Sequence, residues 1–133
     1  MQTKKVLSAD DVKKIAHSAE AEAKKNSWAV TIAIVDDGGH LLWLQRLDGA
    51  APVSAYIGTE KARASAIGRR ETKLYEDMIN QGRAAFLSAP LEGMLEGGVP
   101  IIVDGQVIGA VGVSGVKSTE DAQIAKAGIA ALG

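Results

Sequence analysis

The sequence predicts a single α/β domain of the α+β class, in which helices cover an antiparallel sheet. The chain has 133 residues, enough for one domain with its own core, and no linker or low-complexity segment divides residues 1–133. Two pairs of β-branched segments are each joined by an Asp-Gly turn, and segments with helical spacing precede, separate and follow them. Hairpins that alternate with helices indicate an antiparallel sheet with helices packed on it.

The first helix is expected from Ser8, which suits the N-cap position, to about Asn26. Asp10 and Asp11 favour the positive end of the helix dipole. Apolar residues then recur at helical spacing and predict one narrow buried face, formed by Val12, Ile15, Ala16, Ala19 and Ala23.

Two β-hairpins are expected from the runs of β-branched and apolar residues. The first covers residues 30–47 and turns at the Asp-Gly-Gly of residues 37–39. The second covers residues 99–113 and turns at the Asp-Gly of residues 104–105. Because glycine accepts the positive φ angle that tight turns need, Asp-Gly between apolar runs is a good hairpin signal.

Helices are also expected between and after the hairpins. Pro52 suits the first position of a helix over residues 52–70, and a shorter helix follows over residues 71–80. The last helix is expected to open with a capping box in which Ser118 pairs with Asp121.

The charge balance excludes several classes of partner. Fifteen Lys and Arg against 16 Asp and Glu leave a net charge of −1. The chain therefore lacks the excess of positive charge that binding to nucleic acid or to an anionic membrane requires. The chain has no cysteine, so disulfides and thiolate chemistry are excluded. No apolar run approaches the ~20 residues that span a bilayer, and residues 1–5 lead into no signal-like apolar segment. We therefore expect a cytoplasmic protein.

The composition also predicts self-association. Aromatic residues make up only 4% of the chain, which contains 15 glycines. Small residues allow close backbone contact but bury little apolar area each, so the core of one subunit is expected to be thin. Further burial between subunits would offset this shortfall.

Several motifs occur along the whole chain in a fixed order, at residues 34–39, 46–48, 61–62, 97–101, 109–115 and Asp121. Together they resemble the GlcG/HbpS-like family, also known as the haem-degrading domain or PduO C-terminal-like family. Residues 68–72 and 96–100 are most similar to the GlcG-type members found in glycolate-utilisation operons.

This resemblance implies a profilin-like fold and assembly into rings or higher oligomers, for which we expect a hexamer or octamer. It implies haem binding in some members, so haem is the one cofactor we expect. The kinship with glycolate operons also implies glycolate-type metabolism and a metabolic enzyme as a partner. Fold kinship alone does not transfer an activity.

His17 is the first candidate ligand-binding residue. Helical spacing points His17 away from the apolar face of its helix, with Ala21 one turn on and with Lys13 and Lys24 on the same flank. An exposed imidazole beside a small residue could ligate haem iron, and the two lysines could hold the propionates. The resemblance supports this role, because some haem-binding relatives use a histidine from this region. The alternative is an ordinary solvated histidine.

His40 follows the first turn and is expected to be solvent-exposed. The two histidines come from separate elements and lack metal-binding spacing, so no metal site is predicted.

A second candidate site consists of charged residues inside or near the family motifs. They could line a pocket for a small hydroxy acid, or they could form ion pairs between subunits; they are Arg46, Asp48, Glu60, Lys61, Arg63, Glu96 and Asp121. Gly109 and Gly112 lie in an expected strand, where glycine indicates close packing and not a catalytic loop.

Three functions remain open from the sequence. The first is an oligomeric protein that binds a small ligand, with haem as the candidate. The second is an enzyme acting on a small oxidised metabolite, with Lys61 or an acidic residue as its acid–base group. The third is an accessory subunit that docks on a metabolic enzyme.

Overall fold

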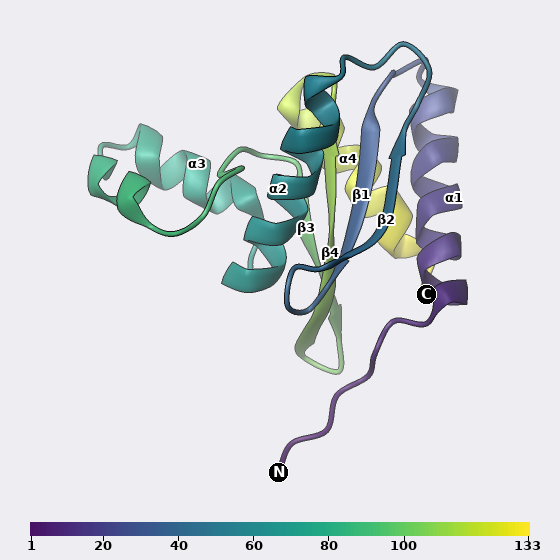
Figure 1. Cartoon of the computed structure of the whole chain (residues 1–133), viewed down its shortest axis with the longest axis horizontal. Coiled ribbons are helices and arrows are strands. Elements are labelled where there is room, and N and C mark those ends of the chain that lie inside the picture. Colours follow the sequence, from purple (N-terminus) through teal and green to yellow (C-terminus); the bar gives the residue numbers. More distant parts are fainter.

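The computed structural model describes residues 1–133 and has an α+β fold (Figure 1). It confirms the expected order of helices and hairpins. The elements are α1 (Ala9–Lys25), β1 (Thr31–Asp36), β2 (Leu41–Arg46), α2 (Val53–Gly68), α3 (Thr72–Asn80), the 3₁₀ helix η1 (Ala84–Ser88), β3 (Gly98–Val103), β4 (Gln106–Ser114) and α4 (Ser118–Ala130).

The four strands form one antiparallel sheet with the order β2-β1-β4-β3. The two hairpins join through the central pair β1 and β4, whose register extends from Thr31 opposite Ser114 to Asp36 opposite Gly109. This pairing leaves β2 and β3 as the edges of the sheet. At the tip of the β3–β4 hairpin, Asp104 and Gly105 both adopt positive φ angles of 52° and 74°, as the Asp-Gly signal predicts.

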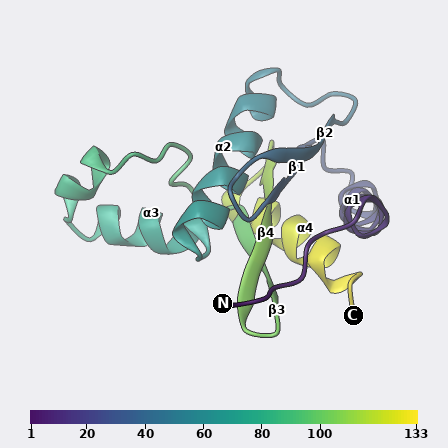
Figure 2. The same cartoon turned by 60° about the horizontal axis from the view of Figure 1, so that its bottom comes forward.

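Helices cover both faces of the sheet. Alternate β1 side chains point to opposite faces, so Ile32 and Ile34 pack with α1 and α4, whereas Ala33 and Val35 pack under α2. Figure 2 shows α1 and α4 together on one side of the sheet and α2 on the other. The short α3 and η1 project from this three-layer body (Figures 1 and 2).

The layer under α2 is built from small residues, as the composition predicts. Its buried cluster contains Ala33, Val35, Ala62, Ala66 and Ala110.

Glycine in β4 brings the α2 backbone against the sheet. A Cβ atom placed on Gly112 would lie 2.1 Å from the Gly58 carbonyl oxygen and 2.4 Å from the Ala62 nitrogen. On Gly109 it would lie 2.5 Å from the Val35 carbonyl oxygen. Both glycines therefore allow close backbone contacts within one subunit, which is the structural role expected for them.

Ser8 is the N-cap of α1, as predicted. Its hydroxyl accepts a hydrogen bond from the Asp11 N–H at 3.1 Å, and the Asp11 carboxylate accepts one from the Ser8 N–H at 2.9 Å. The hydrogen bond from Ser8 lowers the pKa of the Asp11 carboxyl.

The predicted capping box at the start of α4 is wrong. Lys117 is the N-cap, and its N–H donates to the Glu120 carboxylate at 3.3 Å. The Asp121 carboxylate instead turns inward and accepts hydrogen bonds from the Lys61 ammonium and the Val116 N–H. A buried cation competes for this carboxylate more strongly than a solvated helix end, because charges must be paired once they are desolvated.

Candidate functional site

His17 lies on the exposed face of α1, in agreement with its helical spacing. Its imidazole stands edge-on to the indole of Trp43 in β2, with ring centroids 6.4 Å apart and an angle of 89° between the planes. Neither ring nitrogen has a hydrogen-bond partner or an ion-pair partner within the chain. The imidazole is therefore not committed to a partner inside the chain.

Trp43 occupies its place because of the strand register. It lies opposite Ile34 in the β1–β2 ladder, and Ile34 faces α1, so the indole also lies on that face. The Trp43 Nε1 atom is buried and has no hydrogen-bond partner. Trp43 was not among the residues predicted for the site. The signal available in the sequence was an indole between two leucines, in a strand expected next to the His17 helix.

The predicted lysines extend this surface along α1. Lys13 and Lys24 are exposed on the same helical face as His17. Lys13 lines a hollow of about 360 Å³ that also contacts Leu42 and Trp43.

At the other end of this face, Lys24 lines a second hollow of about 370 Å³ together with Arg46 and Asp48. The Lys24 ammonium is also paired with Glu20 Oε1 at 3.1 Å. We call this whole surface the α1–β2 seam, formed by Lys13, His17, Lys24, Trp43, Arg46 and Asp48.

The seven charged candidates do not come together in one pocket. Arg46 and Asp48 belong to the α1–β2 seam. Glu60 and Arg63 form an exposed pair on α2, with Nη1 and Oε2 3.0 Å apart. The hydrogen bond to Asp77 raises the pKa of the Lys73 ammonium, and the negative charge of Glu96 adds to this effect.

Lys61 and Asp121 form the one buried ion pair of the chain. The Lys61 side chain is 4% exposed and that of Asp121 is 3% exposed, and Lys61 Nζ lies 3.1 Å from Asp121 Oδ2. The ammonium also donates to the Val113 carbonyl at 2.9 Å. Burial raises the pKa of the Asp121 carboxyl, whereas the Lys61 charge acts in the opposite direction. The pair links α2, β4 and α4, and its seclusion from solvent favours a structural role.

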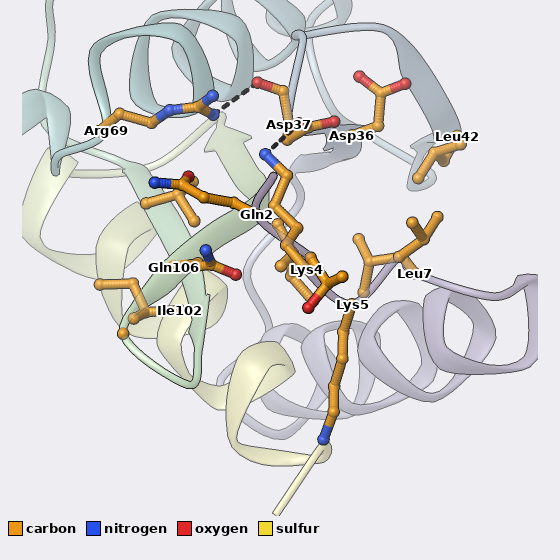
Figure 3. A pocket seen from close by; sticks show the side chains of 15 residues that line it. Gln2, Lys4, Lys5, Leu7, Asp36, Asp37, Leu42, Arg69, Ile102 and Gln106 are labelled. Atoms are coloured by element: carbon orange, nitrogen blue, oxygen red, sulfur yellow. Dashed lines mark hydrogen bonds and ion pairs between the residues drawn. The ribbon is translucent and has the colours of Figure 1, made fainter.

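The largest hollow, about 810 Å³, lies between the N-terminal segment and the tips of the hairpins (Figure 3). Lys4 forms an ion pair with Asp37, which lowers the pKa of that carboxyl, and Arg69 Nη1 donates to the Asp37 carbonyl at 2.7 Å. These contacts tie the N-terminal segment and the start of the α2–α3 connection to the β1–β2 turn. None of the predicted site residues lines it.

His40 lies at the tip of the β1–β2 hairpin, where its side chain is 81% exposed. Its Nδ1 lies 3.2 Å from Asp36 Oδ1. The chain brings no three His, Cys, Asp or Glu side chains together in an arrangement suited to a metal ion. None of its helices combines the length and apolar character needed to cross a membrane.

Comparison with known proteins decides the family. The model of the family described as "Haem degrading protein HbpS-like" matches residues 7–130. The chain is 60% identical to protein GlcG of Escherichia coli K12 over 114 residues, which is 86% of this chain and 85% of that protein. The chain belongs to the HbpS-like family.

Solved HbpS-like structures share the whole fold. A double mutant of HbpS from Streptomyces reticuli aligns with a TM-score of 0.89 at 28% identity, covering 100% of this chain and 91% of the other. The complex of PduOC with haem aligns with a TM-score of 0.85 at 26% identity, covering 96% and 95%. These matches confirm the resemblance to the HbpS-like family and the α+β fold expected from it.

Proposed function

We propose that this protein binds haem as a small ligand at the α1–β2 seam, with the His17 imidazole as axial ligand. The observation that carries the proposal is an exposed histidine without a partner inside the chain, packed edge-on against an indole, in a chain that shares its fold with a solved haem complex. Haem supplies an iron centre that accepts an imidazole nitrogen.

The surroundings of His17 suit a flat apolar ring with two carboxylates. Leu42, which is 42% exposed, and Trp43 offer apolar surface, and Ala21 leaves room one turn further along α1. Lys13 and Lys24 are available for the propionates, because the exposed Lys24–Glu20 pair is worth only about 0–1 kcal/mol.

One subunit shelters only one side of a ligand bound at His17. We therefore propose that the site works within an assembly, a hexamer or octamer, in which a neighbouring subunit covers the open side. The edge strand β2 supports this assembly, because Leu41, Leu42 and Leu44 are 48%, 42% and 47% exposed on it. The small-residue core under α2 supports it as well.

Sedimentation velocity tests the assembly. We expect a hexamer or octamer in which each subunit buries well over ~1,000 Å² against its neighbours. A species that sediments as a monomer at every concentration contradicts this expectation.

Hemin titration tests the ligand and its residue. We expect a Soret band that saturates at a fixed ratio per subunit, and we expect His17→Ala to abolish the shift of that band because the axial imidazole is lost. The matched control is His40→Ala, which removes the other histidine of the chain at the hairpin tip and should leave the shift intact.

Equal hemin binding by both variants would instead indicate adsorption to apolar surface. The better explanation would then be an accessory subunit in glycolate-type metabolism that docks on an enzyme, supported by the 60% identity to GlcG. A pull-down from cells grown on glycolate would test that role. An acid–base role for Lys61 has less support, because the side chains of Lys61 and Asp121 are only 4% and 3% exposed.

A further inference from the structure

The His17 imidazole has one aromatic neighbour and no hydrogen bond to fix its orientation. A histidine that binds a metal usually donates its second N–H to a carboxylate or carbonyl, which orients the ring and supports the bond to the metal. Here the imidazole instead makes an edge-on aromatic contact with the Trp43 indole, at right angles to it. The indole is thus a neighbour that can restrict rotation of the imidazole ring.

Trp43 is held by packing and not by a hydrogen bond. Its Nε1 is buried and unpartnered, so the N–H contributes desolvation cost without a compensating bond. The strand register opposite Ile34 fixes the indole on the face that α1 covers. What Trp43 contributes to this surface is therefore the position and the flat shape of its ring.

We propose that Trp43 is the positioning residue for His17: its indole fixes the orientation of the imidazole and so determines how firmly the chain holds a ligand at that nitrogen. This inference rests on the proposed function and adds to it a residue that would not touch the iron. It also separates two properties of Trp43, because the aromatic ring matters for positioning whereas the N–H does not.

The first experiment uses the protein without hemin. An aromatic ring packed edge-on shifts the NMR signals of neighbouring protons, so the His17 ring protons should be displaced from the positions of a solvated histidine. Trp43→Leu should return them to those positions, and Trp43→Phe should retain a displacement because it keeps an aromatic ring. The signals are assigned by their loss in His17→Ala, and the His40 signals serve as the internal reference. Unchanged His17 signals in Trp43→Leu would overturn the proposal.

The second experiment uses hemin titration. Trp43→Leu should weaken hemin binding roughly 10–100-fold, the usual effect of removing a group that orients a metal ligand. Trp43→Phe should bind as the original chain does. If Trp43→Leu does not fold, Trp43→Met takes its place, because Met is a flexible side chain that fills irregular gaps but has no ring.

The two proposals fail in different ways. If His17→Ala binds hemin as well as the original chain, the haem proposal fails, while the NMR comparison still decides whether the Trp43 ring packs against the imidazole. If His17→Ala loses the Soret shift but the Leu or Met variant at Trp43 keeps full affinity, the haem site stands and the positioning role is wrong. Loss of affinity in Trp43→Phe equal to that in Trp43→Leu would also contradict a role of the ring.

Discussion

Replacing Asp121 with alanine is expected to lower the free energy of unfolding by about 3–5 kcal/mol, because it leaves the buried Lys61 ammonium without its counter-charge. Lys61 would keep only the Val113 carbonyl as a partner, at 2.9 Å. The hydrogen bond from the Val116 N–H, 3.2 Å from Asp121 Oδ1, would be lost as well. Urea denaturation of the two proteins measures the difference.

The matched control removes both charges together. In the double variant Lys61→Met and Asp121→Asn, the amide oxygen can still accept from the Val116 N–H, and no unpaired charge is buried. It should recover most of the stability lost in Asp121→Ala, since replacing a whole buried ion pair is often nearly neutral. A double variant as unstable as Asp121→Ala would show that the charge pairing is not the cause.

The same pair predicts a dependence of stability on pH. Burial raises the pKa of Asp121 in the folded protein above the ordinary value of 3.8. Between pH 3.8 and the raised pKa of the folded protein, the folded state therefore binds more protons at this carboxyl than the unfolded state does. The contribution of Asp121 to the free energy of unfolding should fall as pH rises through this window. The double variant lacks the carboxyl and should lack this component in urea titrations across the window.

Replacing Gly112 with valine is expected to prevent the formation of soluble, assembled protein. The new Cβ would lie 2.1 Å from the Gly58 carbonyl oxygen, so α2 would have to move away from the sheet. Inserting even one methylene into a packed core usually costs about 1–3 kcal/mol, and here the obstacle is backbone, which cannot rotate aside. Soluble yield, sedimentation and thermal unfolding measure the effect.

Gly58→Ala is the control for this variant, because Gly58 faces Gly112 from the α2 side. A Cβ on Gly58 meets its nearest neighbour, Thr31 Cγ2, at 3.5 Å, which is ordinary van der Waals contact. Alanine also favours the helix over glycine by about 0.8–1.0 kcal/mol. Gly58→Ala should therefore fold and assemble normally. If Gly112→Val does so as well, the close-packing explanation is wrong.

Local sequence signals were sufficient for most of the secondary structure. The N-cap at Ser8 and the helical spacing after it place α1, and each Asp-Gly turn places a hairpin. These signals work because they depend on residues a few positions apart, whose contacts are formed within one turn or one hairpin. Local signals failed at the start of α4. Asp121, which was expected to cap the helix, pairs instead with Lys61, 60 positions away.

The sequence by itself determined the α+β class, the family resemblance and the outward direction of His17, because periodicity and motifs are properties of the chain read in order. Only the tertiary structure decided that the charged candidates lie apart, that Lys61 and Asp121 are buried together, and that Trp43 lies against His17. These outcomes depend on which helix covers which strand and in what register. Desolvation then selects the partners, because a charge taken out of water is retained only where the packing supplies its counter-charge.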